Sequence, residues 1–155
     1  MLAEIAAPVA NTFSAGRSAL DAAGQGDRWE EINRAAVGAA MRAREASGQP
    51  VVVAGSIGAW PMVSDLMTFG TRDLAADTLR DLFREQALLL ADAGADVIAL
   101  EMVGPGAYAA PAMEGAGDAG LPVWLGLTVL HVNEDGSTQP GSVSDRADRA
   151  GLGDQ

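Results

Sequence analysis

Four short apolar segments rich in β-branched residues alternate along the chain with longer segments that have a helical period. Strands that alternate with helices in this way form βαβ units, in which neighbouring strands run parallel and the helices cover the sheet. The fold class is therefore α/β, with about four parallel βα units. The expected strands span residues 4–10, 50–54, 96–100 and 122–129, and the expected helices span residues 14–20, 27–47, 73–92 and 107–119.

The length limits which parallel architecture these units can build. A closed (β/α)8 barrel needs eight strands and typically about 250 residues, whereas this chain has 155. Four units correspond to half of such a barrel or to a small doubly wound sheet, and periodicity alone does not separate the two. We expect one domain over residues 1–141. Residues 142–155 lack apolar periodicity and are expected to be a disordered tail.

The charge balance and the apolar runs exclude several classes of partner. Ten Lys and Arg residues stand against 21 Asp and Glu, which gives a net charge of −11. Such a chain is not expected to bind nucleic acid or an anionic membrane surface. No apolar run approaches the roughly 20 residues of a membrane-spanning helix, and the N-terminus lacks the pattern of a secretory signal. A cytoplasmic location is therefore expected.

The sequence contains no cysteine. Disulfides, thiolate nucleophiles and cysteine-ligated zinc are thus excluded within these residues. No other pattern in the chain predicts a metal site.

Reactive groups in a parallel α/β protein gather where strands end and the following loops begin. Here those positions hold neutral hydrogen-bonding groups around a single acid, Glu101. A carboxylate at the end of a buried strand carries a desolvation cost unless a ligand ammonium group, an arginine or solvent compensates it. The strand-end residues are Asn11, Thr12, Gly55, Ser56, Gly58, Glu101, Thr128 and His131.

Three features of the sequence allow more than one interpretation. The glycines of residues 55–58 could cradle a phosphate, but the segment lacks the Walker lysine and the dinucleotide spacing, which favours a tight turn that a substrate approaches. His131 could be a general base, but without a cysteine or second histidine it is better explained as a surface residue. Trp60, in the long loop of residues 59–71, could cover a ligand, whereas Trp124 within a strand is expected to pack.

Five segments, in order, resemble the homocysteine S-methyltransferase family. They are distributed over residues 3 to about 141, so that the resemblance covers most of the chain. The matching segments are residues 10–15 (ANTFSA), 31–36 (EINRAA), 53–58 (VAGSIG), 84–101 (REQA, AGAD and LE in order) and 120–125 (GLPVWL).

This resemblance implies a TIM barrel that binds homocysteine and transfers a methyl group to its thiol, giving methionine. In the family, zinc held by cysteine thiolates favours the substrate thiolate, and the methyl donor is an S-methyl sulfonium such as S-methylmethionine, or a betaine. Carried over to matched positions only, Thr12 contacts the amino-acid part of homocysteine and Glu101 accepts hydrogen bonds from its ammonium group. Asn11, Gly55 and Ser56 belong to the same substrate-binding set.

The chain also departs from the family pattern. The family pattern has an earlier strand that brings a glycine-rich turn with an acid, whereas this chain begins within the following unit, and the zinc-binding cysteines come from strands later than residue 155. We therefore expect a partial chain with about the second to fifth units of an eight-unit barrel, inactive without the remaining segments. The alternatives are a non-catalytic half-barrel binding module or remnant, which self-associates through its sheet edges, and an enzyme acting on a phosphorylated metabolite at residues 55–58.

Overall fold

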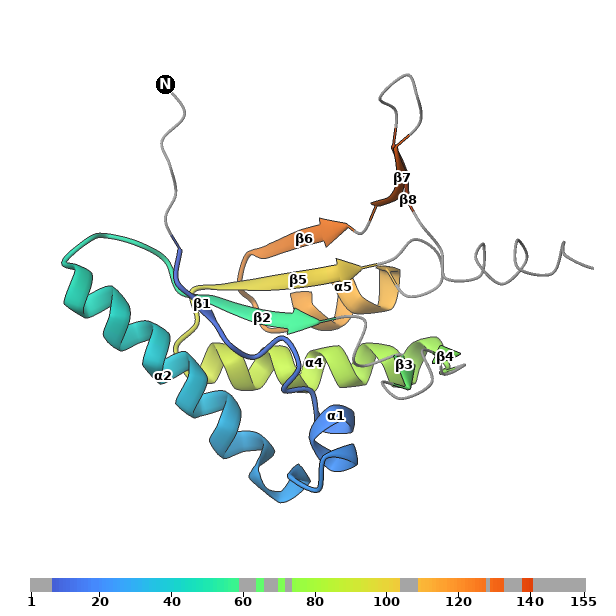
Figure 1. Cartoon of the computed structure of the whole chain (residues 1–155), viewed down its shortest axis with the longest axis horizontal. Coiled ribbons are helices and arrows are strands. Elements are labelled where there is room, and N and C mark those ends of the chain that lie inside the picture. The colour runs from blue at the N-terminus through green and yellow to red at the C-terminus, as the bar shows by residue number, and fades with distance from the viewer. Residues whose placement is uncertain are drawn as a thin grey trace, which may run out of the picture.

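A four-stranded parallel sheet forms the centre of the computed structural model (Figure 1), which describes residues 7–58, 64–65, 70–71, 74–103, 109–127, 129–132 and 138–140. The strand order is β1-β2-β5-β6, and each neighbouring pair is parallel. The predicted α/β class with four parallel strands is thus confirmed. The strands are β1 (Val9–Ala10), β2 (Ala54–Gly58), β5 (Val97–Val103) and β6 (Val123–Leu127).

The helices lie between consecutive strands, as the alternation of the sequence predicts. Figure 1 shows α2 and α4 below the sheet, and residues of α2, α4 and α5 all belong to one core cluster with residues of the strands, so the three helices cover the same face. None of the described helices is long and apolar enough to cross a membrane. The helices are α1 (Arg17–Ala22), the short 3-10 helix η1 (Gly26–Arg28), α2 (Trp29–Ser47), α4 (Ala76–Asp92) and α5 (Ala109–Gly117).

The main hydrophobic core fills the space between these helices and the sheet. Each strand contributes alternate residues to it, because successive side chains point to opposite faces. A Cβ atom on Gly55 would meet Leu90 and Ala95 at 3.1–3.3 Å, so Gly55 faces α4 and lets the helix approach closely. The core includes Val37, Val53, Ile57, Leu79, Phe83, Leu90, Ile98, Leu100, Val103, Ala112 and Ala116.

In β2 and β5, the residues that alternate with the core positions direct their side chains to the other face of the sheet. Ala54, Val97 and Ala99 form a second, small buried cluster there. Ser56 and Glu101 have the same parity as these residues along β2 and β5. The sheet therefore has an apolar helix-covered face and a second face on which polar side chains occur.

Two predicted strand boundaries are wrong. The second strand was expected at residues 50–54 and lies at Ala54–Gly58, and β5 continues past Leu100 to Val103. Glycine and serine weaken a strand prediction, but β2 pairs with β1 on one side and β5 on the other. Because this central segment is part of a sheet ladder, the interpretation of residues 55–58 as a tight turn or phosphate cradle is also wrong.

Two antiparallel hairpins lie outside the parallel sheet and were not predicted. The last expected strand is divided, since β7 follows β6 and pairs with β8, with His131 opposite Gln139. Several expectations fall outside the described residues: the tail at 142–155, Trp60 with most of its loop, Thr128, and the first residues of the expected first strand. The hairpin strands are β3 (Ser64–Asp65), β4 (Gly70–Thr71), β7 (Val129–Val132) and β8 (Thr138–Pro140).

Close packing of α5 on α4 depends on Gly115. A Cβ atom on this buried glycine would overlap the carbonyl oxygen of Arg80 and lie 3.0 Å from the Cβ of Phe83. Gly117, two residues later in the same helix, has nothing within 4 Å of its Cβ position. The helix therefore contains one glycine that its packing requires and one that it does not.

We expect Gly115→Ala to lower the free energy of unfolding by about 1–3 kcal/mol, because the added methyl group forces α5 away from α4. Gly117→Ala is the matched control and should change stability by no more than about 1 kcal/mol. Urea unfolding followed by circular dichroism measures both. Equal stabilities of the two variants would contradict the packing role of Gly115.

Candidate functional site

The site begins where β1 ends. Only Val9 and Ala10 pair with β2, and two residues later the buried Thr12 continues the contact through its side chain. Its Oγ1 donates a hydrogen bond to the carbonyl oxygen of Ser56 at 2.6 Å. The backbone N–H of Gly58 then donates to the carbonyl of Phe13 at 3.2 Å. The chain after β1 is thereby fixed along the edge of β2.

The structure brings Ser56 and Glu101 together on neighbouring strands. The Ser56 hydroxyl donates a hydrogen bond to Oε1 of Glu101 at 2.7 Å. Ser56 is 1% exposed, whereas Glu101 is partly exposed, so the carboxylate is held from the interior and remains accessible. Gly58 is the register partner of Glu101 and has no side chain to cover it.

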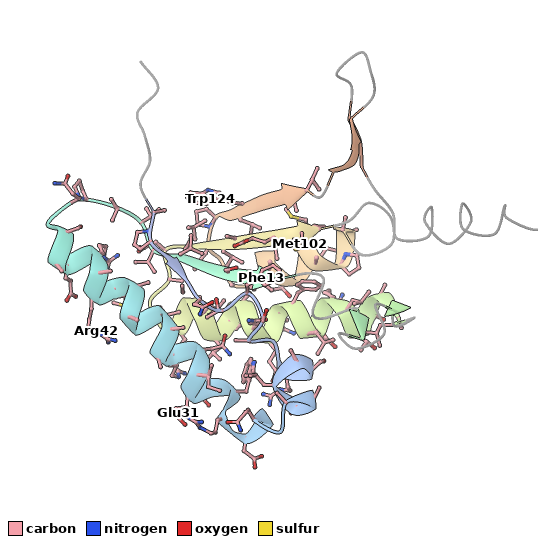
Figure 2. The ribbon with its side chains drawn as sticks, in the orientation of Figure 1. Phe13, Glu31, Arg42, Met102 and Trp124 are labelled. Carbon is pink, nitrogen blue, oxygen red and sulfur yellow. The ribbon has the colours of Figure 1, made fainter. Side chains whose placement is uncertain are left out.

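A backbone irregularity follows Glu101. Met102 is the one residue other than glycine with positive φ (57°) in the described part of the chain, and the register between β5 and β6 shifts between Leu100 and Val103. Figure 2 shows Met102 at this end of β5. Because of this bulge, both Leu100 and Val103 are buried in the helix-facing core. A left-handed non-glycine residue is disfavoured by about 1–3 kcal/mol, and such strain is typical of functional sites.

Every ion pair in the described residues has at least one partner on a helix, and Glu101 takes part in none of them. Arg17 donates to Glu85 at 2.9 Å and lies over the ring of Trp29, with 4.1 Å between the guanidinium carbon and the ring centroid. This hydrogen bond raises the pKa of Arg17. The other ion pairs among the described residues are Arg28–Glu31, Arg34–Glu30, Arg34–Asp92, Arg44–Asp96, Arg80–Asp77, Arg80–Asp81 and Arg84–Asp118.

The remaining pKa shifts also belong to helix surfaces. The hydrogen bond between Arg28 and Glu31 raises the pKa of the guanidinium and lowers that of the carboxyl. Hydrogen bonds to Asp92 and Glu30 raise the pKa of Arg34. Glu31 and Arg42 point away from the sheet (Figure 2). The arginine expected as one neutralising partner of Glu101 is thus not found among the described residues.

Two buried polar residues that the sequence analysis assigned no role support the loop after β1. Gln86 on α4 and Asn33 on α2 are 1% and 0% exposed, respectively. Nε2 of Gln86 donates to the carbonyl of Thr12 at 3.1 Å, and Nδ2 of Asn33 donates to the carbonyl of Ala15 at 2.9 Å. The sequence does contain a sign of both residues: each is polar but occupies a position that the helical period places on the apolar face of its helix.

The structure does not bring all of the predicted site residues together. Thr12, Ser56 and Glu101 form one hydrogen-bonded series, and the exposed Asn11 precedes Thr12 at the end of β1. Gly55 does not belong with them, because its Cβ position faces Leu90 and Ala95 across the helix-covered face. Trp124, expected to pack, is 44% exposed.

Comparisons with known proteins identify the family and the fold of the chain. The sequence profile of the family described as homocysteine S-methyltransferase matches residues 3–148. The chain belongs to the homocysteine S-methyltransferase family. The fold resembles the crystal structure of the homocysteine methyltransferase MmuM from Escherichia coli in its oxidized form, with a TM-score of 0.63 and 19% identity. A comparison with the sequences of curated proteins gives no match.

The match to that homocysteine methyltransferase covers 85% of this chain and 49% of the other. The chain thus spans about half the length of this solved relative. The prediction of a partial (β/α)8 barrel is confirmed, and the alternative of a doubly wound sheet is not supported.

The residues of this homocysteine S-methyltransferase family member do not fit the zinc site that the family implies. Zinc in such sites is bound by cysteine thiolates, and the sequence contains no cysteine. Within the described ranges, no group of three or more His, Asp or Glu side chains could hold a metal ion. What these residues provide is a hydrogen-bonded carboxylate at the end of two parallel strands.

Proposed function

We propose that residues 1–141 are the homocysteine-binding part of a homocysteine S-methyltransferase, an enzyme that transfers a methyl group to the homocysteine thiol and forms methionine. The observation that carries this proposal is the Ser56–Glu101 pair, a partly exposed carboxylate held by a buried hydroxyl where β2 and β5 end. Membership of the family supports the choice of ligand.

The ammonium group of homocysteine is the proposed partner of Glu101. A carboxylate held in a partly buried position interacts strongly with a cation, and charge-assisted hydrogen bonds are about twice as strong as neutral ones. Ser56 uses its single hydroxyl proton on Oε1, which fixes the carboxylate and leaves its other oxygen for the ligand. Asn11, exposed at the end of the neighbouring β1, is proposed to contact the same ligand.

Thr12 takes a different part from the one that the resemblance implies. It is 0% exposed, and its hydroxyl proton is donated to the carbonyl of Ser56. We therefore propose that Thr12 holds the Ser56 backbone in place, and that Ser56 and Glu101 provide the contact surface for the amino acid.

Methyl transfer also requires a thiolate, since the thiol form is a poor nucleophile. In the family this thiolate is favoured by zinc, which the residues of this chain do not fit. The proposed methyl donor is S-methylmethionine or a betaine. Recognition of the amino-acid end of homocysteine is the step for which this chain has residues.

We expect the full chain to bind homocysteine and Glu101→Gln to raise the Kd at least about tenfold, because the substitution removes a charge-assisted hydrogen bond to the ammonium group. Isothermal titration calorimetry measures both values. Glu114→Gln, on the exposed side of α5, makes the same change of charge and should leave the Kd unchanged.

A second ligand tests where Glu101 acts. 4-Sulfanylbutanoate has the thiol and carboxylate of homocysteine but no ammonium group. Its binding should be equally weak in the unmodified chain and in Glu101→Gln. If Glu101→Gln raised the Kd of both ligands to the same extent, the proposed contact with the ammonium group would be wrong.

We expect no methyl transfer by this chain alone when it is supplied with homocysteine, zinc and S-methylmethionine, because none of its residues is a cysteine. Methionine formation measured by mass spectrometry decides this. Zinc-dependent turnover well above a reaction without protein would show that the chain provides a complete catalytic site by other means.

A non-catalytic half-barrel that self-associates is the second candidate. The observation in its favour is the apolar surface of β6, which lies at one end of the strand order among the described residues. Leu125 and Leu127 on this strand are 41% and 55% exposed. An apolar edge strand is a template for pairing with another chain.

If β6 mediates association, the unmodified chain should be larger than a monomer in size-exclusion chromatography with light scattering, and Leu127→Lys should shift it toward the monomer. Added salt should strengthen the association, since it screens repulsion between copies that each carry a net charge of −11. A monomer at every salt concentration would contradict this candidate.

A further inference from the structure

Gln86 is a buried polar residue in the middle of an apolar helix face. On α4 it lies between Phe83 and Leu90, both of which are fully buried in the main core. Its Nε2 donates to the carbonyl of Thr12 at 3.1 Å and makes a longer contact of 3.4 Å with Oδ1 of Asn33. The amide thus links α4 to the loop after β1 and to α2.

The orientation of both amides follows from their neighbours. Nδ2 of Asn33 lies 2.9 Å from two carbonyl oxygens, those of Ala15 and Trp29, so it must be the donor end. Oδ1 of Asn33 is then directed at Gln86, and the Thr12 carbonyl is a second acceptor on that side. Two acceptors require the NH2 group of Gln86 there.

This orientation leaves Oε1 of Gln86 buried without a hydrogen-bond partner among the described residues. A buried unsatisfied acceptor is destabilising, and an apolar side chain of similar size would avoid that penalty. General packing therefore does not explain a glutamine at this position. The two donors that it directs toward the loop are a more specific explanation.

A continuous series of hydrogen bonds runs from Gln86 to the carboxylate. Gln86 donates to the carbonyl of Thr12, the Thr12 hydroxyl donates to the carbonyl of Ser56, and the Ser56 hydroxyl donates to Glu101. We propose that Gln86, together with Asn33, is a positioning residue that holds Thr12 and, through Ser56, sets the position of the Glu101 carboxylate. The part of this proposal that concerns homocysteine rests on the proposed function.

Gln86→Met tests the proposal, because methionine keeps the length of the side chain and removes its donors. Hydrogen exchange followed by mass spectrometry should show about tenfold faster exchange in peptides covering residues 11–16 and 54–58, with residues 109–117 of α5 unchanged. The Kd for homocysteine should rise by a similar factor. Gln49→Met, at an exposed position after α2, is the matched control and should change neither measurement.

The outcomes separate the two proposals. Faster exchange confined to the loop and β2 supports the positioning role whether or not the unmodified chain binds homocysteine. Absence of homocysteine binding by the unmodified chain would overturn the proposed function but not the positioning role. Unchanged exchange, or a uniform increase that includes α5, overturns the positioning role. Homocysteine binding that is unchanged in Gln86→Met overturns the link from Gln86 to Glu101.

Gln86→Glu provides a second test that does not depend on the fit of methionine. An ionised carboxylate has no proton to donate and would repel the Thr12 carbonyl, whereas the protonated acid can donate one hydrogen bond to it. Burial of the carboxyl group that this substitution introduces disfavours its ionised form. After correction for intrinsic rates, exchange at residues 11–16 should slow at least severalfold as the pH is lowered from 8 to 5.5 in this variant and not in Gln86→Met. The same pH dependence in both variants would overturn the proposal.

Discussion

The helices α2, α4 and α5 all pack on one face of the parallel sheet (Figure 1), and this constraint determines the role of each strand residue. Along β2 and β5, the side chains that face the helices are apolar. At Gly55 there is no side chain, so that α4 can approach the strand closely. The intervening residues face the other side, where Ser56 and Glu101 meet. A shift of one residue would turn Ser56 in β2, or Glu101 in β5, toward the helices and expose the core residues of that strand. The position of the candidate site is thus a consequence of how the core is packed.

The ends of β1 and β5 depart from regular strand pairing, and these departures place the polar groups. β1 pairs through only two residues, after which the Thr12 side chain substitutes for a backbone donor to β2. β5 contains a bulge in which Met102 has φ of 57°, so that Glu101 lies on one side while Leu100 and Val103 remain in the core. The positive φ of Met102 carries a local energetic cost that the core packing of Leu100 and Val103 on either side offsets. They keep the carboxylate partly exposed and fixed by a hydrogen bond from the interior.

Periodicity in the sequence was sufficient to predict the parallel fold, because helix and strand periods and the order of elements are local properties. The same reasoning identified Thr12, Ser56 and Glu101 as strand-end residues. It misplaced β2, since the glycines and serine of residues 54–58 have weak strand preference and adopt a strand only between two partners. It assigned no role to Asn33 and Gln86, because a polar residue on an apolar helix face gains its partner from a distant loop. Hydrogen bonds that join residues 53 and 74 positions apart have no local signature.

Recognition of an amino acid and activation of its thiol are separate physical tasks, and the proposed function assigns only the first to the residues of this chain. An ammonium group is bound by a carboxylate whose position is fixed before the ligand arrives, which reduces the entropy lost on binding. Glu101 meets this condition through Ser56, and the support extends inward through Thr12 to two helices. In the family, zinc held by cysteine thiolates favours the substrate thiolate, and cysteine does not occur in the sequence of this chain. The carboxylate proposed to bind the ammonium group is therefore fixed by hydrogen bonds that come from this chain's own strands and helices.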